Sequence, residues 1–245
     1  MAGFFSIVFS LLKTPYYHSV LISICENFML LPWSDIETVF LDMDGTLLDL
    51  HFDNHFWLEY LPERYGQTYG LTVEQAKQTL LSQYATLQGK LQWYCIDYWT
   101  DSLNLPILKF KQEIAHLIKW RNHAELFLKL INEMGKQVIL ITNAHPKSLN
   151  LKMQKVDLAP WFKHIISSHD YNFPKENQYF WQHLGEQVTF NPHSSLFIDD
   201  SISVLRSAKQ YGIKHLFAIY QPDSQKPPLK DEHEFAIIKD YIDCF

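Results

Sequence analysis

Residues 38–46, TVFLDMDGT, join an apolar strand-forming run to two carboxylates and a glycine. Side chains alternate between the faces of a strand, so we expect Asp42 and Asp44 on one face while Met43 points into the core. Gly45 lets the backbone turn sharply where the strand ends. Ligands of open α/β sheets bind beyond the carboxyl ends of the strands, and the two carboxylates are therefore expected to face a substrate.

Carboxylates this close repel each other unless a cation lies between them, they share a proton, or both conditions hold. The same conditions allow one carboxylate to act as a nucleophile and the other as a proton donor. An isolated Asp-x-Asp pattern is more often a pair of solvated residues that leads into a turn. The other strand ends of the chain distinguish these two interpretations.

A second apolar run, residues 137–141, is followed by Thr142 and Asn143. A threonine at a strand end can donate its hydroxyl and its backbone N–H to a phosphate oxygen. Asn143 is expected to belong to the same site, to cap the helix that begins near Pro146, or to do both.

Two further charged motifs complete the pattern. Lys175 lies in a loop before a predicted helix, where a point charge could hold an anionic nucleophile and a phosphate together, although a single loop lysine is usually solvated. Asp199 and Asp200 end the apolar run of residues 195–198. Adjacent acids at a strand end can ligate a hard cation, and one of the two usually faces away and caps a helix.

These motifs, in this order and context, resemble those of the haloacid dehalogenase-like hydrolases. The resemblance implies a phosphatase in which Asp42 attacks phosphorus and Asp44 protonates the leaving oxygen, so that an aspartyl-phosphate forms on Asp42. It also implies a Mg²⁺ cofactor, or Mn²⁺, Co²⁺ or another divalent cation in its place. The expected metal ligands are Asp42, Asp44 through its backbone carbonyl, and Asp199.

The phosphate is expected to be bound by residues from the second and third motifs. Thr142 and Lys175 would hold its oxygens as charge develops, with Asn143 beside them. Asp200 would support Lys175 or the waters around the metal. The expected catalytic residues are Asp42, Asp44, Thr142 and Lys175.

Within the superfamily, the chain looks like the bacterial GMP/IMP nucleotidases from about Pro32 to the C-terminus. The segments that carry this likeness are residues 41–50, 52–54, 93–95, 97–99, 142–146, 174–176 and 196–201. The likeness implies hydrolysis of the purine nucleoside 5′-monophosphates GMP and IMP to nucleoside and phosphate. The motifs by themselves indicate only phosphate-ester chemistry.

Several other activities can be weighed against particular residues. Phosphatases of FMN, phosphoglycolate or a sugar phosphate stay open on the sequence, as does a sugar phosphomutase, which shares every motif. A dehalogenase needs no acid for its leaving group, so Asp44 argues against that activity. A non-catalytic phosphate-binding protein commonly lacks one of the two acids, and this chain keeps both.

The predicted fold class is α/β: a Rossmann-like doubly wound parallel sheet in residues 31–48 and 122–245, with an inserted all-helical cap of the C1 type in residues 49–121. A closing cap would expel water and strengthen charge interactions around a phosphate. The predicted core strands are residues 38–42, 137–142, 164–167, 195–199 and 214–220, and the predicted core helices are 124–134, 147–156, 176–184 and 202–211.

Inside the predicted cap, Thr72 and Gln75 have the form of a capping box, and apolar residues recur at helical spacing from Ala76 to Leu91. A second helix is indicated around residues 110–118. The segment is rich in aromatic residues, one of which could stack on a purine at about 1–3 kcal/mol per contact. Aromatic residues at helical spacing more often pack the core of a small bundle. The residues in question include Trp57, Trp93, Tyr94, Tyr98 and Trp99.

Composition limits the partners. The chain has 245 residues and a formal net charge of −6, without a basic stripe, which argues against a nucleic-acid polymer and leaves a small phosphate ester as the expected partner. Three widely spaced cysteines suit a reducing cytoplasm and are interpreted as structural.

The histidines, among them His169, lack the paired spacing of a zinc site and are expected at the surface. His145 is expected either to contact phosphate or ribose, or to lie exposed at a helix start. The sequence does not determine the oligomeric state.

Residues 1–30 form a hydrophobic extension that differs from the rest of the chain. Its apolar runs are too short to span a bilayer, and a signal peptide would need a basic start and a small-residue cleavage site. Our hypothesis is that the working protein begins at Met29 and that residues 1–28 reflect the choice of start codon. A membrane-associated leader is the alternative, and no membrane partner is otherwise expected.

Overall fold

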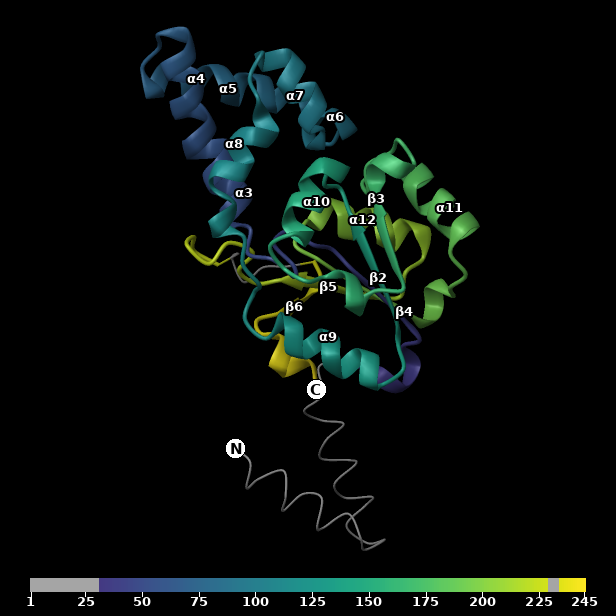
Figure 1. The fold of residues 1–245 in the computed structure, drawn as a ribbon. Coiled ribbons are helices and arrows are strands. Elements are labelled where there is room, and N and C mark those ends of the chain that lie inside the picture. Colours follow the sequence, from purple (N-terminus) through teal and green to yellow (C-terminus); the bar gives the residue numbers. More distant parts are fainter. Residues whose placement is uncertain (1–30, 229–233) are drawn as a thin grey trace, which may run out of the picture.

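The computed structural model describes residues 31–228 and 234–245, so the hypotheses about the N-terminal extension and Met29 lie outside the described residues. Its centre is a parallel sheet with strand order β3-β2-β1-β4-β5-β6 (Figure 1). The strands are β1 (Thr38–Leu41), β2 (Gln137–Thr142), β3 (His164–Ser167), β4 (Ser195–Asp199), β5 (His215–Ile219) and β6 (Ala236–Ile238).

The central strand β1 is hydrogen-bonded on both sides. Thr38 is in register with Gln137 of β2 and with Ser195 of β4. All four residues of β1 are buried, as expected for a parallel strand covered on both faces. Because these three strands run in the same direction from a common register, their carboxyl ends meet at one edge of the sheet, and the three strand-end motifs meet there too.

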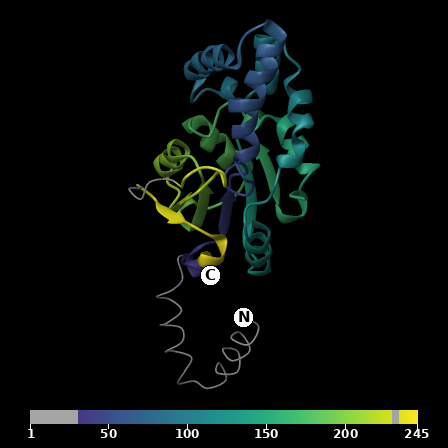
Figure 2. The ribbon, with the colours of Figure 1, turned by 90° about the vertical axis from the view of Figure 1, so that its left-hand side faces the viewer.

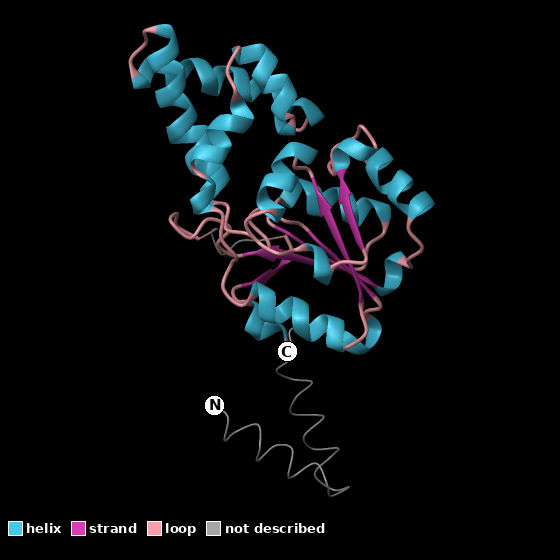
Figure 3. Cartoon of the chain, viewed as in Figure 1, coloured by secondary structure: helices cyan, strands magenta, loops and turns pink. Residues whose placement is uncertain are grey.

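Helices cover both faces of the sheet, which confirms the doubly wound prediction (Figure 3). Apolar residues of α9 (Ala124–Glu133) and α10 (Pro146–Met153) pack on one face with Val39 and Leu41. Those of α11 (Gln178–Gln187) and α12 (Ile202–Tyr211) pack on the other face with Phe40. The alternation of side chains along β1 thus supplies a core on each side.

Several predicted boundaries differ from the structure. Strand β6 was not predicted, because it has three residues and lacks a long apolar run. The helix expected to run to Leu91 ends at Leu87, since Gly89 adopts a positive φ of 77° that interrupts the helix. The predicted capping box is confirmed: the Thr72 side chain accepts the Gln75 N–H, and the Gln75 side chain accepts the Thr72 N–H.

A group of helices, residues 51–117, is inserted between β1 and α9 and lies on the side of the sheet opposite the chain's C-terminus (Figure 2). We call this group the helical insertion. It consists of α3 (His51–His55), a π-helical turn (Phe56–Tyr60), α4 (Leu61–Tyr69), α5 (Val73–Leu87), α6 (Leu91–Tyr94), α7 (Ile96–Leu103), α8 (Ile107–Glu113) and a short 3₁₀ turn (Ala115–Leu117).

The two connections of the helical insertion run side by side. The N–H of Arg121 donates to the carbonyl of Leu47 at 2.9 Å, and the N–H of Asp49 donates to that of Lys119 at 3.0 Å. Such a paired connection suits a hinge, but the predicted domain boundaries and the cap role of this segment stay predictions.

In the described ranges, 31–228 and 234–245, no helix combines the length and apolar character needed to cross a membrane.

Candidate active site

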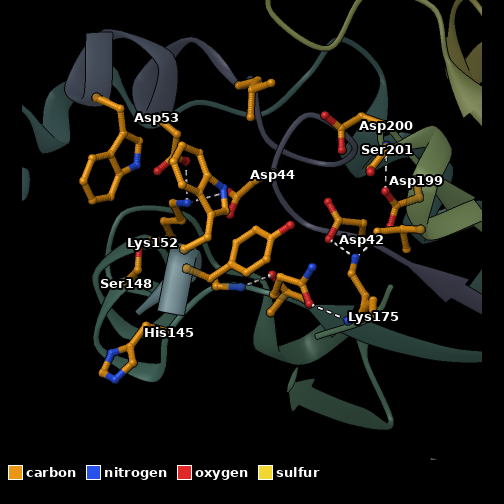
Figure 4. Close-up of a pocket in the computed structure, with 18 of the residues that line it drawn as sticks. Asp42, Asp44, Asp53, His145, Ser148, Lys152, Lys175, Asp199, Asp200 and Ser201 are labelled. Carbon is orange, nitrogen blue, oxygen red and sulfur yellow. Dashed lines mark hydrogen bonds and ion pairs between the residues drawn. The ribbon is translucent and has the colours of Figure 1, made fainter. Parts of the chain in front are cut away.

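Asp42 lies buried directly after β1, where it meets the predicted loop lysine. The Lys175 ammonium donates to Oδ1 of Asp42 at 2.5 Å and to Oδ2 of Asp199 at 2.7 Å (Figure 4). Only 1% of Lys175 is exposed, so it is not a solvated loop lysine. Its loop is held in place because the carbonyl of Lys175 accepts the indole N–H of the buried Trp181 at 2.9 Å.

The surroundings perturb both charges of this pair. Burial raises the pKa of Asp42 to about 6, with Asp199 adding to the rise and Lys175 opposing it. Burial alone would lower the pKa of Lys175, but Asp199 and Asp42 outweigh burial and raise it. At neutral pH the pair is therefore an anionic carboxylate held against a cation, the condition that an anionic nucleophile needs beside a phosphate.

Asp44 lines the same pocket as Asp42, as the strand alternation predicted. Oδ1 of Asp44 lies 2.6 Å from Nζ of Lys152, which projects from α10. Burial raises the pKa of Asp44 to about 6, and Lys152 limits this rise. A carboxyl group with a pKa near neutrality can donate a proton and then accept one.

A charged network that the sequence did not indicate continues from Lys152 into the helical insertion. Lys152 donates to Oδ2 of Asp53 at 2.6 Å, and Lys111 donates to Oδ1 of Asp53 at 2.6 Å. Each lysine is 1% exposed. Burial would raise the pKa of Asp53, but the two lysines hold it well below its ordinary value. One available signal was the position of Lys152 three residues after Leu149, on the apolar side of a predicted helix.

Thr142 and Asn143 end β2 and lie buried beside Lys175. The Thr142 hydroxyl oxygen accepts the N–H of Ala144 at 3.0 Å, which leaves its own proton to donate. Oδ1 of Asn143 accepts the N–H of Lys175 at 2.9 Å. The residue that caps α10 is His145, so the alternative in which Asn143 caps that helix is wrong.

Glu176 joins Asn143 to the helical insertion. Nδ2 of Asn143 donates to Oε2 of Glu176 at 3.0 Å, and the hydroxyl of Tyr94 donates to Oε1 of Glu176 at 2.7 Å. The amide orientation of Asn143 is therefore set from both sides of the pocket. Glu176 was not among the predicted site residues, and Tyr94 was considered only as an aromatic residue that could stack on a purine.

Three carboxylates form a group that could hold a metal ion: oxygens of Asp42, Asp199 and Asp200 all lie within 4.8 Å of one another. Oδ2 of Asp199 is engaged by Lys175, and its Oδ1 accepts the N–H of Ser201 at 2.8 Å. Among the described residues, Asp200 accepts no hydrogen bond and so offers free oxygens. An all-oxygen, anionic donor set fits Mg²⁺ or a similar hard cation.

Gly45 makes room for Asp200. Its φ is +79°, and a Cβ on this residue would lie 2.5 Å from Oδ2 of Asp200. The glycine of the first motif is therefore required twice, by the left-handed backbone and by the close approach of a carboxylate.

Residues of the helical insertion, among them Asp53, line one side of the pocket over these groups (Figure 4). Trp57, Trp93 and Tyr94 line it, and the rings of Trp57 and Trp93 lie 6.4 Å apart at 25°. Trp99 is instead buried within the insertion, where it packs edge-on against Trp93. The aromatic residues are thus divided between the insertion's core and the pocket wall.

Comparison with known proteins identifies the family. A family model described as haloacid dehalogenase-like hydrolase matches residues 36–212, which include every strand-end motif described above. The chain is a haloacid dehalogenase-like hydrolase. This hydrolase is also 40% identical over 192 residues to the GMP/IMP nucleotidase YrfG of Escherichia coli (strain K12), covering 78% of this chain and 86% of that protein. The protein of the same name from Shigella flexneri is similar to the same extent.

Solved structures share the fold of this hydrolase. A HAD phosphatase from Thermococcus onnurineus has a TM-score of 0.70 at 18% identity, covering 84% of this chain and 95% of that chain. A putative β-phosphoglucomutase from Thermotoga maritima has a TM-score of 0.60 at 17% identity, covering 85% of this chain and 97% of that chain. These likenesses confirm the Rossmann-like α/β core. The predicted roles of Asp42, Asp44, Thr142, Lys175 and the metal ligands stay predictions.

Proposed function

We propose that this phosphatase hydrolyses the 5′-monophosphates of purine nucleosides, GMP and IMP, through an aspartyl-phosphate on Asp42. The observation that carries the proposal is the buried Lys175 ammonium bound to both Asp42 and Asp199 at the carboxyl edge of the sheet. It keeps a nucleophilic carboxylate charged where an anionic ester would bind. The substrate class rests on the 40% identity to a GMP/IMP nucleotidase.

In the first step Asp42 attacks phosphorus. A bond forms between its carboxylate oxygen and phosphorus while the bond from phosphorus to the ribose oxygen breaks. Asp44 gives its proton to the departing oxygen, which leaves as the nucleoside hydroxyl. In the second step Asp44 accepts a proton from water as the water attacks the aspartyl-phosphate, and inorganic phosphate leaves with Asp42 restored.

The neighbouring polar groups hold the phosphate during both steps. Thr142 donates its hydroxyl to a phosphate oxygen, and Lys175 pairs with another as the charge shifts. Asn143, fixed by the Lys175 N–H and by Glu176, presents its remaining amide proton to the same region. These groups lie within the structure before substrate binds, so little reorganisation is needed.

A divalent cation, Mg²⁺ or in its place Mn²⁺ or Co²⁺, would be held by Asp42, Asp199, Asp200 and the backbone carbonyl of Asp44. When bound, it would neutralise the repulsion between the carboxylates and the phosphate. The three side chains fit this role, because their oxygens converge within 4.8 Å and the pKa of Asp200 is raised well above its ordinary value by burial and by Asp199. Without a cation these acids repel one another.

The purine would lie against the helical insertion. The Trp57 and Trp93 rings, which line the same pocket as Asp42, offer stacking surfaces. The insertion would serve as the predicted C1-type cap, excluding water around the phosphate. We also assign the reaction to the cytoplasm, where the free Cys95 and Cys244 would stay reduced.

The test is phosphate release from GMP, IMP, AMP, CMP, FMN, phosphoglycolate and sugar phosphates, with Mg²⁺ and with chelator. We expect Mg²⁺-dependent release that is fastest with GMP and IMP. Faster turnover of FMN, phosphoglycolate or a sugar phosphate would keep the chemistry and replace the substrate. Conversion of a sugar phosphate to its isomer without phosphate release would indicate a phosphomutase, and no turnover of any ester would contradict the enzymatic proposal.

A further inference from the structure

A second group of metal-binding side chains lies at the junction of the helical insertion and the sheet. Cys95, His145 and His169 each offer one ligand atom, and these atoms all lie within 4.8 Å of one another. Cys95 lies in the insertion, directly before α7, and His145 lies directly before α10. His169 lies in a 3₁₀ turn, Ser168–Asp170, that follows β3. Three segments that are distant in the sequence thus bring one thiol and two imidazoles together.

This group is separate from the carboxylates of the proposed active site. His145 lies at the rim of the pocket near Ser148, away from Asp42 (Figure 4). Cys95 and His169 do not line the pocket. The proposed phosphatase chemistry uses none of the three side chains.

One ring nitrogen of His169 is uncommitted. Its Nε2 is buried and, within the described part of the chain, has no hydrogen-bond partner. Burial lowers the pKa of His169 to about 4 and also lowers that of His145, so both rings are neutral at physiological pH. Neutral imidazole is the form that binds a metal.

The other two ligands make only long contacts that a metal could replace. Sγ of Cys95 accepts the N–H of Tyr98 at 3.4 Å, and Nδ1 of His145 accepts the N–H of Lys147 at 3.3 Å. A metal bound at Nε2 of His145 would move the ring proton to Nδ1 and end the contact with Lys147. The rings of His145 and His169 meet edge to face, with centres 4.9 Å apart. Bonds of about 2.0–2.3 Å from zinc to nitrogen and sulfur place tetrahedral donors roughly 3.3–3.8 Å apart, so an approach of about 1 Å completes the geometry.

The carboxylate of Asp97 lies close enough to His145 to serve as a fourth ligand. Oδ2 of Asp97 lies 3.7 Å from Nε2 of His145, and Oδ1 of Asp97 is bound by Lys147 at 2.5 Å. A carboxylate that already faces the histidine can either coordinate the metal itself or hold a metal-bound water. The donor set is then one thiolate, two imidazoles and one oxygen.

We propose that Cys95, His145 and His169 form a binding site for a borderline-soft divalent cation of the Zn²⁺ class, which ties the helical insertion to the sheet. Thiolate and imidazole select such a cation over Mg²⁺, which prefers oxygen. On binding, the Cys95 thiol loses its proton to the buffer and a sulfur–metal bond forms. Because Cys95 belongs to the insertion and the two histidines to the core, the bound ion holds the two parts together.

The experiment uses the full chain, stripped of metal and then saturated with Mg²⁺ so that the carboxylate site is filled. Co²⁺ is titrated in, and thiolate-to-cobalt charge transfer is followed by absorbance before Zn²⁺ displaces the Co²⁺. We expect one thiolate-bound Co²⁺ per chain and a rise in melting temperature with Zn²⁺. Cys95→Ser should abolish the charge-transfer band, and His169→Gln should weaken Co²⁺ binding by more than about 100-fold.

Two control variants accompany these. Cys244→Ser removes the other described thiol, and His183→Gln removes a half-buried histidine paired with Glu186, so both should keep the band. Circular dichroism establishes whether each variant is folded. If Cys95→Ser does not fold, His169→Gln tests the site independently. Absence of a band in the wild-type chain, or a band that persists in folded Cys95→Ser, would overturn the proposal. The readout does not depend on phosphatase activity, so it stands or falls separately from the proposed function.

Discussion

The ammonium of Lys152 lies 2.6 Å from Oδ1 of Asp44, so the proposed acid of the reaction is held by a lysine from α10. Lys152 is shared with Asp53, which belongs to the helical insertion. The orientation of Asp44 therefore depends on contacts made across the junction between the insertion and the sheet. Lys152 is a positioning residue in this arrangement.

Replacing Lys152 with methionine should impair proton donation more than phosphate binding. We expect kcat for GMP to fall at least tenfold further than kcat for p-nitrophenyl phosphate, whose leaving group needs no protonation; one decade is about 1.4 kcal/mol of barrier. Steady-state rates on the two esters give the comparison. Lys155→Met, at an exposed position just beyond α10, is the matched control. Equal losses on both esters would contradict a role through Asp44.

Asp53→Asn should destabilise the fold, because two buried ammonium groups lose their shared carboxylate. Removal of one partner from a buried ion pair costs about 3–5 kcal/mol. Adding Lys111→Met should recover part of the loss, since Lys152 and Asp44 then remain as a balanced pair. The urea midpoints of the single and double variants decide this. If the double variant unfolds at the same urea concentration as Asp53→Asn, the two lysines do not share Asp53 energetically.

Asp42→Asn removes the proposed nucleophile while keeping its shape. We expect phosphate release from GMP to fall by at least about 1000-fold, or roughly 4 kcal/mol of barrier, with circular dichroism unchanged. Rapid-quench analysis should also find no covalent phosphate on the variant. Activity within about tenfold of wild type would exclude the aspartyl-phosphate on Asp42.

Gly45→Ala separates backbone strain from the contact with Asp200. The new Cβ would lie 2.5 Å from Oδ2 of Asp200, so Mg²⁺ affinity and turnover should both fall, by tenfold or more at about 1.4 kcal/mol per decade. Gly135→Ala imposes the same type of strain at φ +72° with nothing within 4 Å of the new Cβ. This control should lose stability only. If the two variants turn over GMP at the same rate, the contact of the new Cβ with Asp200 does not affect catalysis. Glycine would then be needed at position 45 only for its left-handed backbone.

Asp200→Asn should change the dependence of stability on pH. The pKa of Asp200 is raised by burial and by Asp199, so the folded protein binds more protons than the unfolded chain. Its contribution to stability is therefore full below the ordinary pKa of 3.8 and is lost as pH rises through the raised value. Without metal, the variant should melt higher than wild type at pH 8, and this difference should shrink toward pH 4.

Mg²⁺ should reverse that order at pH 8, because it stabilises wild type by about 2.7 kcal/mol at a hundred times its Kd and the variant by less. Calorimetry with and without Mg²⁺ measures both effects. A variant that melts below metal-free wild type at pH 8 would show that Asp200 is not under repulsion from its neighbours.

The strand-end motifs were predictable because each depends on a local pattern. The apolar run before Asp42 specifies a buried strand, and Asp44 follows it in the turn that Gly45 allows, where it lines the same pocket. Runs of the same kind locate Thr142 and Asp199, and the parallel topology brings all these ends to one edge. Lys175 was predicted as a loop residue, but its burial between two carboxylates depends on Trp181 and Asn143, which hold the loop from other elements.

Tertiary structure alone decided which groups meet across the junction with the helical insertion. Asp53 and Lys111 reach Lys152 only because α3 and α8 dock over α10, and a buried lysine on one helix does not reveal its partner on another. Cys95 likewise meets His145 and His169 through the same docking. The physical reason is the separation of these residues along the sequence. Strand alternation and turn chemistry act between sequence neighbours, whereas these contacts depend on how separate elements pack.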